Sequence, residues 1–233
     1  CSLSGAKLIL GSATPLIVSY YKAKKGEYRL ICLTKRAGLG TLPRTEIVDM
    51  RKELAEGNRS IFSRRLFYAI KEKLDKKEQI MLFLNRRGYS TFVSCRKCGY
   101  VMTCSNCSVA YKYHYKGNFL MCHYCGKKIS VPTICPKCGS KYIKYFGTGT
   151  QKIEEEVRRY FPAARVLRMD FDTVAKKGSH EKILSAFAKR EADILIGTQM
   201  IDKGHDFENV SLVGIMAADI SLNTGDYRGS EVT

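Results

Sequence analysis

The sequence predicts an α/β fold, in which a parallel sheet is covered by helices and interrupted by a small cysteine-rich module. Short apolar runs alternate with stretches of helical periodicity, which is typical of parallel strands buried on both faces. Four Cys-x-x-Cys pairs stand between two of these runs. With 233 residues the chain is long enough for one such domain and an insertion.

The elements are expected in the order of these runs. Lys7–Leu10 is predicted to be a buried strand that leads into the loop Gly11–Pro15. Ser63–Asp75 has the periodicity of an amphipathic helix, and the apolar run Ile80–Leu84 follows it as a strand. Beyond the cysteines we expect strands over Tyr142–Phe146, Arg165–Met169, Asp193–Gly197 and Val210–Met216, and helices over Gln151–Tyr160 and His180–Lys189.

The paired cysteines are the candidate metal ligands. The pairs are Cys95/Cys98, Cys104/Cys107, Cys122/Cys125 and Cys135/Cys138. Eight thiolates match the ligand count of two tetrahedral Zn²⁺ ions, and four thiolates on each ion leave no position for a water, so the zinc is expected to be structural. A disulfide framework fits less well, because no signal peptide is visible and disulfides rarely persist in the cytosol.

A glycine after the second cysteine of a pair allows the backbone to take a positive φ there. Gly99, Gly126 and Gly139 occupy that position after three of the pairs, and Ser108 is the exception.

The segment between Cys107 and Cys122 decides which pairs we expect to share an ion. Apolar and polar residues alternate over 109–115 and a turn follows at Lys116–Asn118, which indicates a β-hairpin. A hairpin brings the second and third pairs together at its open end. This favours a nested arrangement, with Cys95, Cys98, Cys135 and Cys138 on one ion and Cys104, Cys107, Cys122 and Cys125 on the other. Pairing of neighbours along the chain is the alternative. His114 and His123 could replace a ligand, but with eight thiols available they are interpreted as surface residues.

The charge of the chain predicts an acidic partner. The sequence has 40 Lys and Arg against 22 Asp and Glu, a net charge of +18, and residues 95–140 contain seven basic and no acidic residues. Two zinc ions with four thiolates each would leave that module at about +3. Aromatic residues are interleaved with the basic ones, which favours single-stranded or branched nucleic acid over a membrane. Tyr111 and Tyr113 are interpreted as the core of the module.

Two loops resemble motifs of superfamily-two helicases. Gly11-Ser12-Ala13-Thr14-Pro15 looks like motif III, and Ile194–Met200 with Lys203–Phe207 looks like motif V. An insertion of eight cysteines directly after Asn85–Tyr89 is specific to the replication-restart helicases of that superfamily. Gly147–Glu156, Arg168–Asp170 and Leu222–Arg228 are similar as well, so the chain resembles this family over essentially its whole length.

The resemblance implies that the parallel sheet is RecA-like and belongs to the second lobe of a helicase motor. It divides the chain into 1–25 as the end of the first RecA-like domain, 26–50 as the interdomain connection, 51–94 and 141–233 as two parts of the second RecA-like domain, and 95–140 as the zinc insertion.

The family's activity would be ATP-driven 3′-to-5′ DNA unwinding, with recognition of stalled or branched forks and a start of primosome assembly in the bacterial cytoplasm, at the nucleoid. ATP and Mg²⁺ would join the two zinc ions as cofactors. Single-stranded and branched DNA, primosome proteins and single-strand-binding protein would be the partners, with no membrane. Coupling to DNA or nucleotide would involve Ser12, Thr14, Thr148, Thr150, Thr198, Gln199, Gly204 and Asp206. The basic DNA-binding candidates are Arg86, Arg87, Lys97 and Lys127.

Three parts of such a motor are missing from these 233 residues. The sequence contains no Gly-x-x-x-x-Gly-Lys-Ser/Thr phosphate loop, no Asp-Glu-x-His box and no arginine-bearing motif VI. Because phosphoryl transfer needs groups that place the phosphates and Mg²⁺, we expect no ATP hydrolysis by this chain alone. A non-enzymatic zinc-ribbon adaptor for nucleic acid is the alternative, and motifs III and V favour the motor.

Overall fold

The computed structural model describes residues 4–35, 43–84, 92–114, 117–146, 149–170, 173–174, 178–198 and 207–219. The chain divides into two compact units, an N-terminal one that ends at Glu46 and a larger one that begins at Ile47. Each is described by itself.

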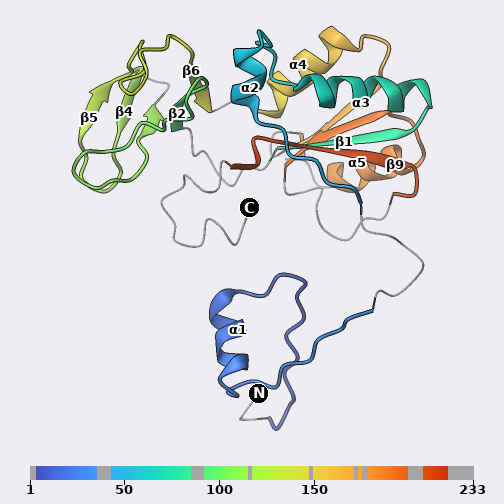
Figure 1. Ribbon diagram of the computed structural model, residues 1–233. Coiled ribbons are helices and arrows are strands. Elements are labelled where there is room, and N and C mark those ends of the chain that lie inside the picture. The colour runs from blue at the N-terminus through green and yellow to red at the C-terminus, as the bar shows by residue number, and fades with distance from the viewer. Residues whose placement is uncertain are drawn as a thin grey trace. The chain divides into compact units, whose positions relative to one another are not determined.

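The larger unit contains a four-stranded parallel sheet (Figure 1). Its strands are β1 (Gln79–Leu84), β7 (Val166–Met169), β8 (Ile194–Gly197) and β9 (Val210–Met216), in the spatial order β7-β8-β1-β9. All three pairings are parallel, so the strands end at one common edge. The predicted α/β fold with a parallel sheet is confirmed.

Helices cover both faces of this sheet (Figure 1). α3 (Arg64–Asp75) and α4 (Thr150–Tyr160) lie on one face and α5 (Ser179–Ala188) lies on the other. A shorter helix, α2 (Met50–Ala55), precedes α3 and was not predicted. The Ser63 hydroxyl begins α3 by accepting a hydrogen bond from the Leu66 N–H at 3.1 Å.

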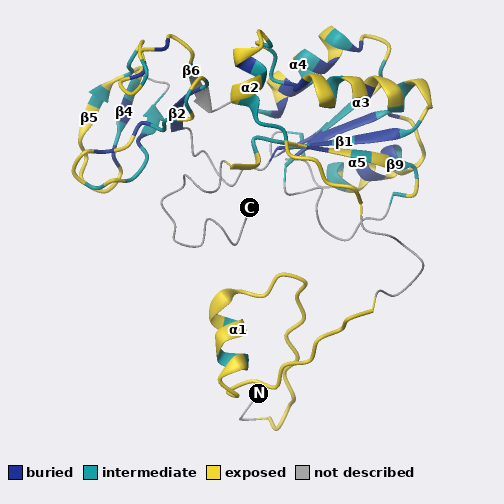
Figure 2. Ribbon diagram, in the orientation of Figure 1, coloured by how far each residue is buried: buried dark blue, intermediate teal, exposed yellow. Residues whose placement is uncertain are grey.

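The alternation of side chains along each strand explains why two separate cores form. Ile80 and Leu82 of β1 are fully buried among the residues of α3 and α4. Leu195 of β8 and Met169 of β7 point to the opposite face, where they pack with Phe187 of α5. β1 and β8 are therefore apolar on both sides and appear as the dark blue centre of Figure 2.

The cysteine-rich module consists of two small antiparallel sheets. β2 (Phe92–Cys95) pairs with β6 (Ile143–Phe146), and β3 (Lys112–His114), β4 (Phe119–Met121) and β5 (Lys128–Ser130) form the second sheet. The predicted hairpin is confirmed as β3 and β4, and β5 is an additional strand. β6 is a strand as expected, but it pairs with β2 and not with the parallel sheet.

The expected strand Lys7–Leu10 is wrong. Residues 6–12 form neither helix nor strand, and Leu8, Ile9 and Leu10 are 68, 89 and 68% exposed. A buried strand needs neighbours on both sides, and the described part of the N-terminal unit contains one helix, α1 (Ile17–Lys24), and no strand. An apolar run therefore did not suffice to predict a strand here.

Gly214 of β9 provides a test of the packing between the sheet and α3. A Cβ atom at Gly214 would lie 2.8 Å from Leu82 Cδ2 and 3.1 Å from Leu66 Cδ1. We expect Gly214→Ala to lower the free energy of unfolding by about 1–3 kcal/mol, because the core has no room for a methyl group. Urea denaturation measures this change. Val213→Ala, at a position that is 56% exposed, is the matched control, and an equal effect of the two substitutions would contradict the packing described.

Candidate metal centre and nucleic-acid interface

Each Cys-x-x-Cys pair forms the same backbone turn, which we call a knuckle. In the first, the Gly99 N–H donates to the Cys95 carbonyl at 2.8 Å and the Cys95 N–H donates to the Tyr100 carbonyl at 2.8 Å. The same two hydrogen bonds recur at the same spacing in the other three knuckles, at 2.8 or 2.9 Å. The residue after each pair has a positive φ, between 55° and 75°, and this includes Ser108 at 55°. The serine therefore adopts the conformation that glycine provides elsewhere.

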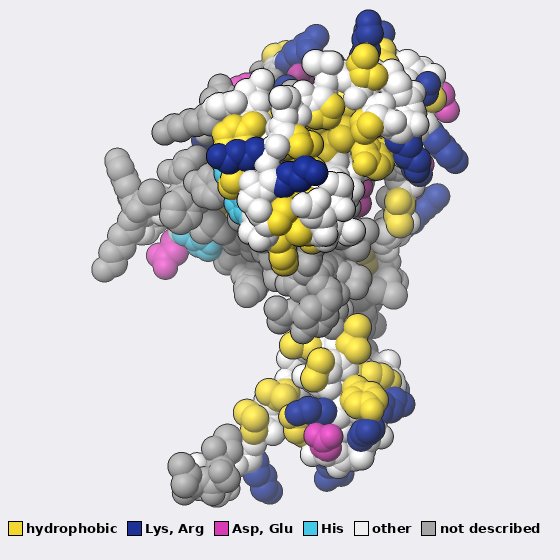
Figure 3. All heavy atoms as spheres, turned by 90° about the vertical axis from the view of Figure 1, so that its left-hand side faces the viewer, with side chains coloured by type: hydrophobic (Ala, Val, Ile, Leu, Met, Phe, Trp, Pro, Cys, Tyr) yellow, Lys and Arg dark blue, Asp and Glu magenta, His cyan; other side chains and the backbone are white. Residues whose placement is uncertain are grey.

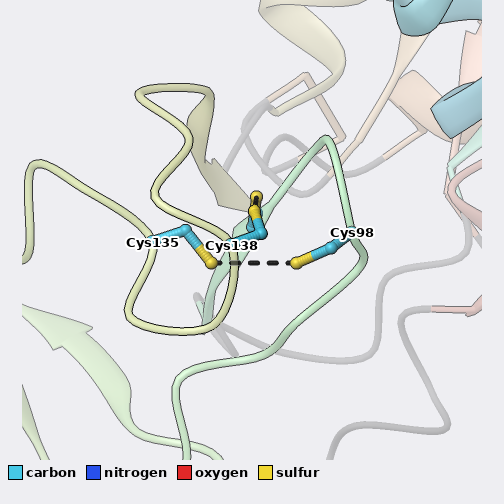
Figure 4. A group of neighbouring side chains, drawn as sticks. Cys98, Cys135 and Cys138 are labelled. Atoms are coloured by element: carbon cyan, nitrogen blue, oxygen red, sulfur yellow. Dashed lines mark hydrogen bonds between the residues drawn. The ribbon is translucent and has the colours of Figure 1, made fainter.

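The knuckles bring the eight thiols together in two groups of four. One group is Cys95, Cys98, Cys135 and Cys138, and the other is Cys104, Cys107, Cys122 and Cys125. Within each group all the sulfur atoms lie within 4.8 Å of one another. The grouping is the nested one: the first knuckle faces the fourth, and the second faces the third. Figure 4 shows Cys98 and Cys135 turned toward one another from opposite sides of the first group.

The sulfur separations fit a tetrahedral metal ion. Cys95 Sγ lies 3.6 Å from Cys138 Sγ, and Cys98 Sγ lies 3.7 Å from Cys135 Sγ. In the second group, Cys104 Sγ and Cys125 Sγ are 3.7 Å apart. Zn–S bonds of about 2.3 Å in a tetrahedron place sulfurs about 3.8 Å apart, whereas a disulfide needs about 2.05 Å. The donor set and its spacing both suit Zn²⁺.

Backbone N–H groups favour a thiolate at the first cysteine of two knuckles. Burial by itself raises the pKa of Cys95, but the N–H groups of Cys98 and Lys97 lower that pKa to about 7. The equivalent N–H groups of the second knuckle outweigh burial in the same way and lower the pKa of Cys104 to about 6. One thiol in each group is therefore prepared to ionise near neutral pH.

Other thiols of the same groups resist ionisation. Hydrogen bonding with Cys125, followed by burial, raises the pKa of Cys107 to about 12. At Cys138 the Ser140 N–H lowers the pKa, but burial and the neighbouring thiols outweigh it and raise the pKa to about 12. Four adjacent thiolates repel one another, so a cation among them is what allows all four to become ligands.

The cysteines are also part of the module's small core. Cys104 and Cys122 are buried together with Tyr111, Leu120 and Met102. Burial, followed by the nearby Cys104 thiol, raises the pKa of the Tyr111 phenol to about 12, so Tyr111 is neutral. The interpretation of Tyr111 as core is confirmed, and Tyr113 is partly buried against the same cluster. So small an apolar core makes metal bonds the natural source of stability.

Arg96 of the first knuckle fastens the module to the α/β lobe. Its guanidinium donates to the Arg59 carbonyl at 2.9 Å and to the Ser60 carbonyl at 3.1 Å, both in the segment between α2 and α3. In the opposite direction, the Arg59 guanidinium carbon lies 5.8 Å from the ring centroid of Tyr142. Burial lowers the pKa of Arg96. This anchor was not found from the sequence, where Arg96 counted only as one of the module's basic residues.

The outer surface of the module mixes basic and apolar side chains. Figure 3 looks onto this surface and shows the two kinds side by side. Of the sequence-predicted DNA contacts, Lys97 is exposed in the first knuckle and Lys127 is exposed after the third, where its Nζ donates to Ser105 Oγ at 2.8 Å. Tyr124, three residues before Lys127, is 73% exposed. Cations with an accessible aromatic face suit a phosphate backbone and its bases.

Two of the predicted motor residues lie at the edge where the parallel strands end. Thr150, the first residue of α4, is buried, and its hydroxyl donates to the Asp170 carboxylate, which directly follows β7. Thr198 follows Gly197, and Gly197 is the register partner of Met169. Asp170 and Thr198 thus leave the sheet at one edge, with the start of α4 beside them.

Asp170 organises this edge. Burial by itself raises its pKa, but hydrogen bonds from Thr150 and Thr173 and the Arg168 guanidinium lower that pKa below its ordinary value. Arg168 Nη1 lies 3.1 Å from Asp170 Oδ2, and Arg168 Nε lies 3.2 Å from Glu154 Oε2. In the sequence, residues 168–170 stood out only because they resemble the corresponding stretch of the replication-restart helicases.

The structure does not test the placement of the remaining coupling residues, or of Arg86 and Arg87, at this edge. Ser12 and Thr14 belong to the N-terminal unit, where both are exposed and the Thr14 N–H donates to Ser12 Oγ at 3.1 Å. The other six lie outside the described residues: Thr148, Gln199, Gly204, Asp206, Arg86 and Arg87.

Comparison with known proteins identifies the family. Residues 104–129 match the family described as the PriA DNA helicase Cys-rich region domain. Over 97% of its length the chain is 53% identical to the replication restart protein PriA of Bacillus subtilis, and over 98% it is 48% identical to that of Synechocystis. The chain belongs to the PriA family. It is also 40% identical, over 98% of its length, to the PriA of Chlamydia trachomatis.

The chain spans 28% of the first two PriA relatives and 31% of the third. The resemblance to replication-restart helicases is confirmed, and the Cys-rich match together with the two thiol groups indicates two zinc sites. None of the helices in the described part of the chain has the length and apolar composition that a membrane span requires.

Ser108 and Gly126 provide reciprocal tests of the knuckle geometry. Both have a positive φ, 55° and 73° respectively. Gly126→Ser is expected to lower the free energy of unfolding by about 1 kcal/mol, because a side chain is strained in this conformation. Ser108→Gly is expected to raise the free energy of unfolding by up to about 1 kcal/mol. The relief of backbone strain is partly offset, because glycine loses more conformational entropy on folding than serine does. Thermal unfolding of the zinc-loaded protein measures both, and effects of the opposite sign would contradict the geometry.

Arg96→Ala tests the anchor between the module and the lobe. Loss of two hydrogen bonds from a charged donor is expected to destabilise the docked module by about 1–3 kcal/mol. Hydrogen exchange should become faster in β2 and β6 while the bound zinc is unchanged. Lys97→Ala, in the same knuckle but exposed, is the control. If both variants exchange at the same rate, Arg96 is not an anchor.

Proposed function

We propose that this chain is the zinc-bearing part of the second motor lobe of an ATP-dependent 3′-to-5′ DNA helicase that acts in replication restart. Membership of the PriA family and the parallel sheet covered on both faces support this assignment. The zinc ligands in the proposal are the two groups of four thiols. Their role is structural: the metal would hold four knuckles in place and would leave no coordination position for a substrate.

The observation that carries the proposal is the path of the chain between the module and the sheet edge. β6, which pairs with β2 at the base of the module, is followed after a short link by α4, whose first residue donates to Asp170. A module that contains no Asp or Glu is therefore joined directly to the edge of the parallel sheet, and parallel sheets bind their ligands at this edge. In this proposal the module contacts DNA, and Thr198 and the start of α4 contact backbone phosphate or transmit nucleotide state.

The wider activity is proposed from the family. The whole protein would use ATP and Mg²⁺, bind stalled or branched forks, and recruit primosome proteins and single-strand-binding protein in the bacterial cytoplasm, close to the chromosome. Ser12, Thr14, Thr148, Gln199, Gly204 and Asp206 keep their proposed coupling roles, and Arg86 and Arg87 their proposed DNA contacts.

Single cysteine substitutions test the two zinc sites. Cys104→Ser and Cys138→Ser are each expected to lower the zinc content from two ions per chain to one, because three thiolates and a hydroxyl hold Zn²⁺ poorly. Far-ultraviolet circular dichroism should show that the parallel sheet and its helices stay folded, since they have their own cores. Cys32→Ser, at an exposed cysteine outside both groups, is the control and should keep two zinc ions. Zinc content that does not change in Cys104→Ser and Cys138→Ser would refute the ligand assignment.

DNA binding tests the basic surface of the module. We expect salt-sensitive binding of single-stranded or forked DNA, and Lys97→Glu and Lys127→Glu should each reduce the slope of log K against log salt by about one. Lys189→Glu, after α5, makes the same change of charge outside the module and is the control. Affinity that does not depend on salt, or an equal loss in the control, would count against the interface. ATP turnover stimulated by DNA in this chain alone would contradict its proposed dependence on the rest of the motor.

A further inference from the structure

Two contacts hold the start of α4 to the end of strand β7. The Thr150 hydroxyl donates to Oδ2 of Asp170, and the two residues are only 4 and 8% exposed. One turn further along α4, Glu154 Oε2 lies 3.2 Å from Arg168 Nε. Arg168 belongs to β7 and Asp170 directly follows it, so the end of one strand binds the helix at two points.

Other groups fix the Asp170 carboxylate. Its Oδ1 accepts a hydrogen bond from the Thr173 N–H at 3.1 Å, and its Oδ2 lies 3.1 Å from Arg168 Nη1. The Asp170 N–H donates in turn to Thr173 Oγ1 at 2.9 Å. Because both oxygens have partners, the carboxylate is held in one orientation, in which Oδ2 faces Thr150.

The helix α4 has no capping side chain of its own. Gly149 is its N-cap residue and provides no side-chain oxygen, and the first turn contains no Asp or Glu. Helix starts are commonly stabilised by such groups. Here a carboxylate from another element contacts the start of the helix through the Thr150 hydroxyl. The direction in which α4 begins therefore depends on Asp170.

The start of α4 is also where the chain returns from the cysteine-rich module to the sheet. β6 ends at Phe146, and α4 begins at Thr150. The chain leaves the sheet for the module after β1, which ends at Leu84. β1, β7 and β8 are parallel, so both connections of the module lie at the edge where the strands end. Asp170 secures the second connection.

We propose that Asp170 is a positioning residue for DNA binding, which holds the start of α4 so that the cysteine-rich module and the carboxyl edge of the sheet contact the same DNA. The inference rests on the proposed function, in which the module and Thr198 at that edge both contact DNA. Two linked surfaces bind more tightly than either alone, but the gain is lost where their geometry does not let both engage. Because a carboxylate repels phosphate, Asp170 acts through Thr150 and not by touching DNA.

Binding of forked DNA by the zinc-loaded chain tests this role, with the affinity measured by fluorescence anisotropy. Asp170→Asn and Thr150→Val are each expected to weaken binding about tenfold, because α4 is no longer held. Thr150→Ser keeps the hydroxyl and should bind as the unchanged chain does. The double variant with Asp170→Asn and Thr150→Val should bind no more weakly than either single variant, since both substitutions remove the same contact.

The sign of the effect separates positioning from electrostatics. Removal of a negative charge by itself strengthens binding to DNA, so weaker binding by Asp170→Asn has no electrostatic explanation. Asp193→Asn is the matched control. Its carboxylate is also ion-paired, with Arg165 Nη2 at 2.7 Å, but it precedes β8 at the opposite edge of the sheet. This variant should bind forked DNA as tightly as the unchanged chain or more tightly.

A merely structural role is tested in the same samples. Zinc content and thermal unfolding show whether each variant is folded under the assay conditions, and in a folded population a loss of stability alone leaves the affinity unchanged. Hydrogen exchange without DNA tests the first step of the inference. The amides of α4 should exchange faster in Asp170→Asn and Thr150→Val than in Asp193→Asn.

Either of two results would overturn the inference. One is hydrogen exchange in α4 that is the same in Asp170→Asn, Thr150→Val and the unchanged chain. The other is binding of forked DNA by both variants that is as tight as that of the unchanged chain. An unchanged chain that binds no forked DNA would refute the proposed function, which is thereby distinguished from a failure of Asp170 to position α4.

Discussion

The need to hold four sulfur atoms within reach of one ion governs the structure of the cysteine-rich module. Four thiols whose sulfur atoms lie 3.6–3.7 Å apart cannot all ionise without a cation, because neighbouring thiolates repel one another. The pKa values reflect this repulsion: in each group one thiol has a pKa of about 6 or 7 and another has a pKa of about 12. The apolar core of the module is small and includes cysteines of the second group. Metal binding and folding of the module are therefore one process.

The first thiol group has a second role, because its knuckle also contacts the α/β lobe. Arg96 lies between the two cysteines of that knuckle and donates to carbonyls that precede α3. The second group has no such contact among the described residues and holds the hairpin. The two groups therefore have different structural roles. The first group joins the module to the lobe, and the second group maintains the surface that bears Lys127 and Tyr124.

Local chemistry could be predicted from the sequence, and long-range contacts could not. The periodicity of Ser63–Asp75 and the spacing of the cysteines each reflect residues close in sequence, and both yielded elements that the structure contains. Lys7–Leu10 has the composition of a strand but lacks partners, and β6 joins β2 because pairing depends on the whole module. Arg96 and Asp170 gain their roles from residues elsewhere in the chain, so no local pattern marks them.

X-ray absorption at the zinc K-edge of the purified chain tests the central claim most directly. Two Zn²⁺ per chain, each with four sulfur neighbours at about 2.3 Å and no oxygen or nitrogen, are the result that this account predicts. A first shell that contains oxygen or nitrogen, or a chain that purifies folded with no zinc, would contradict it.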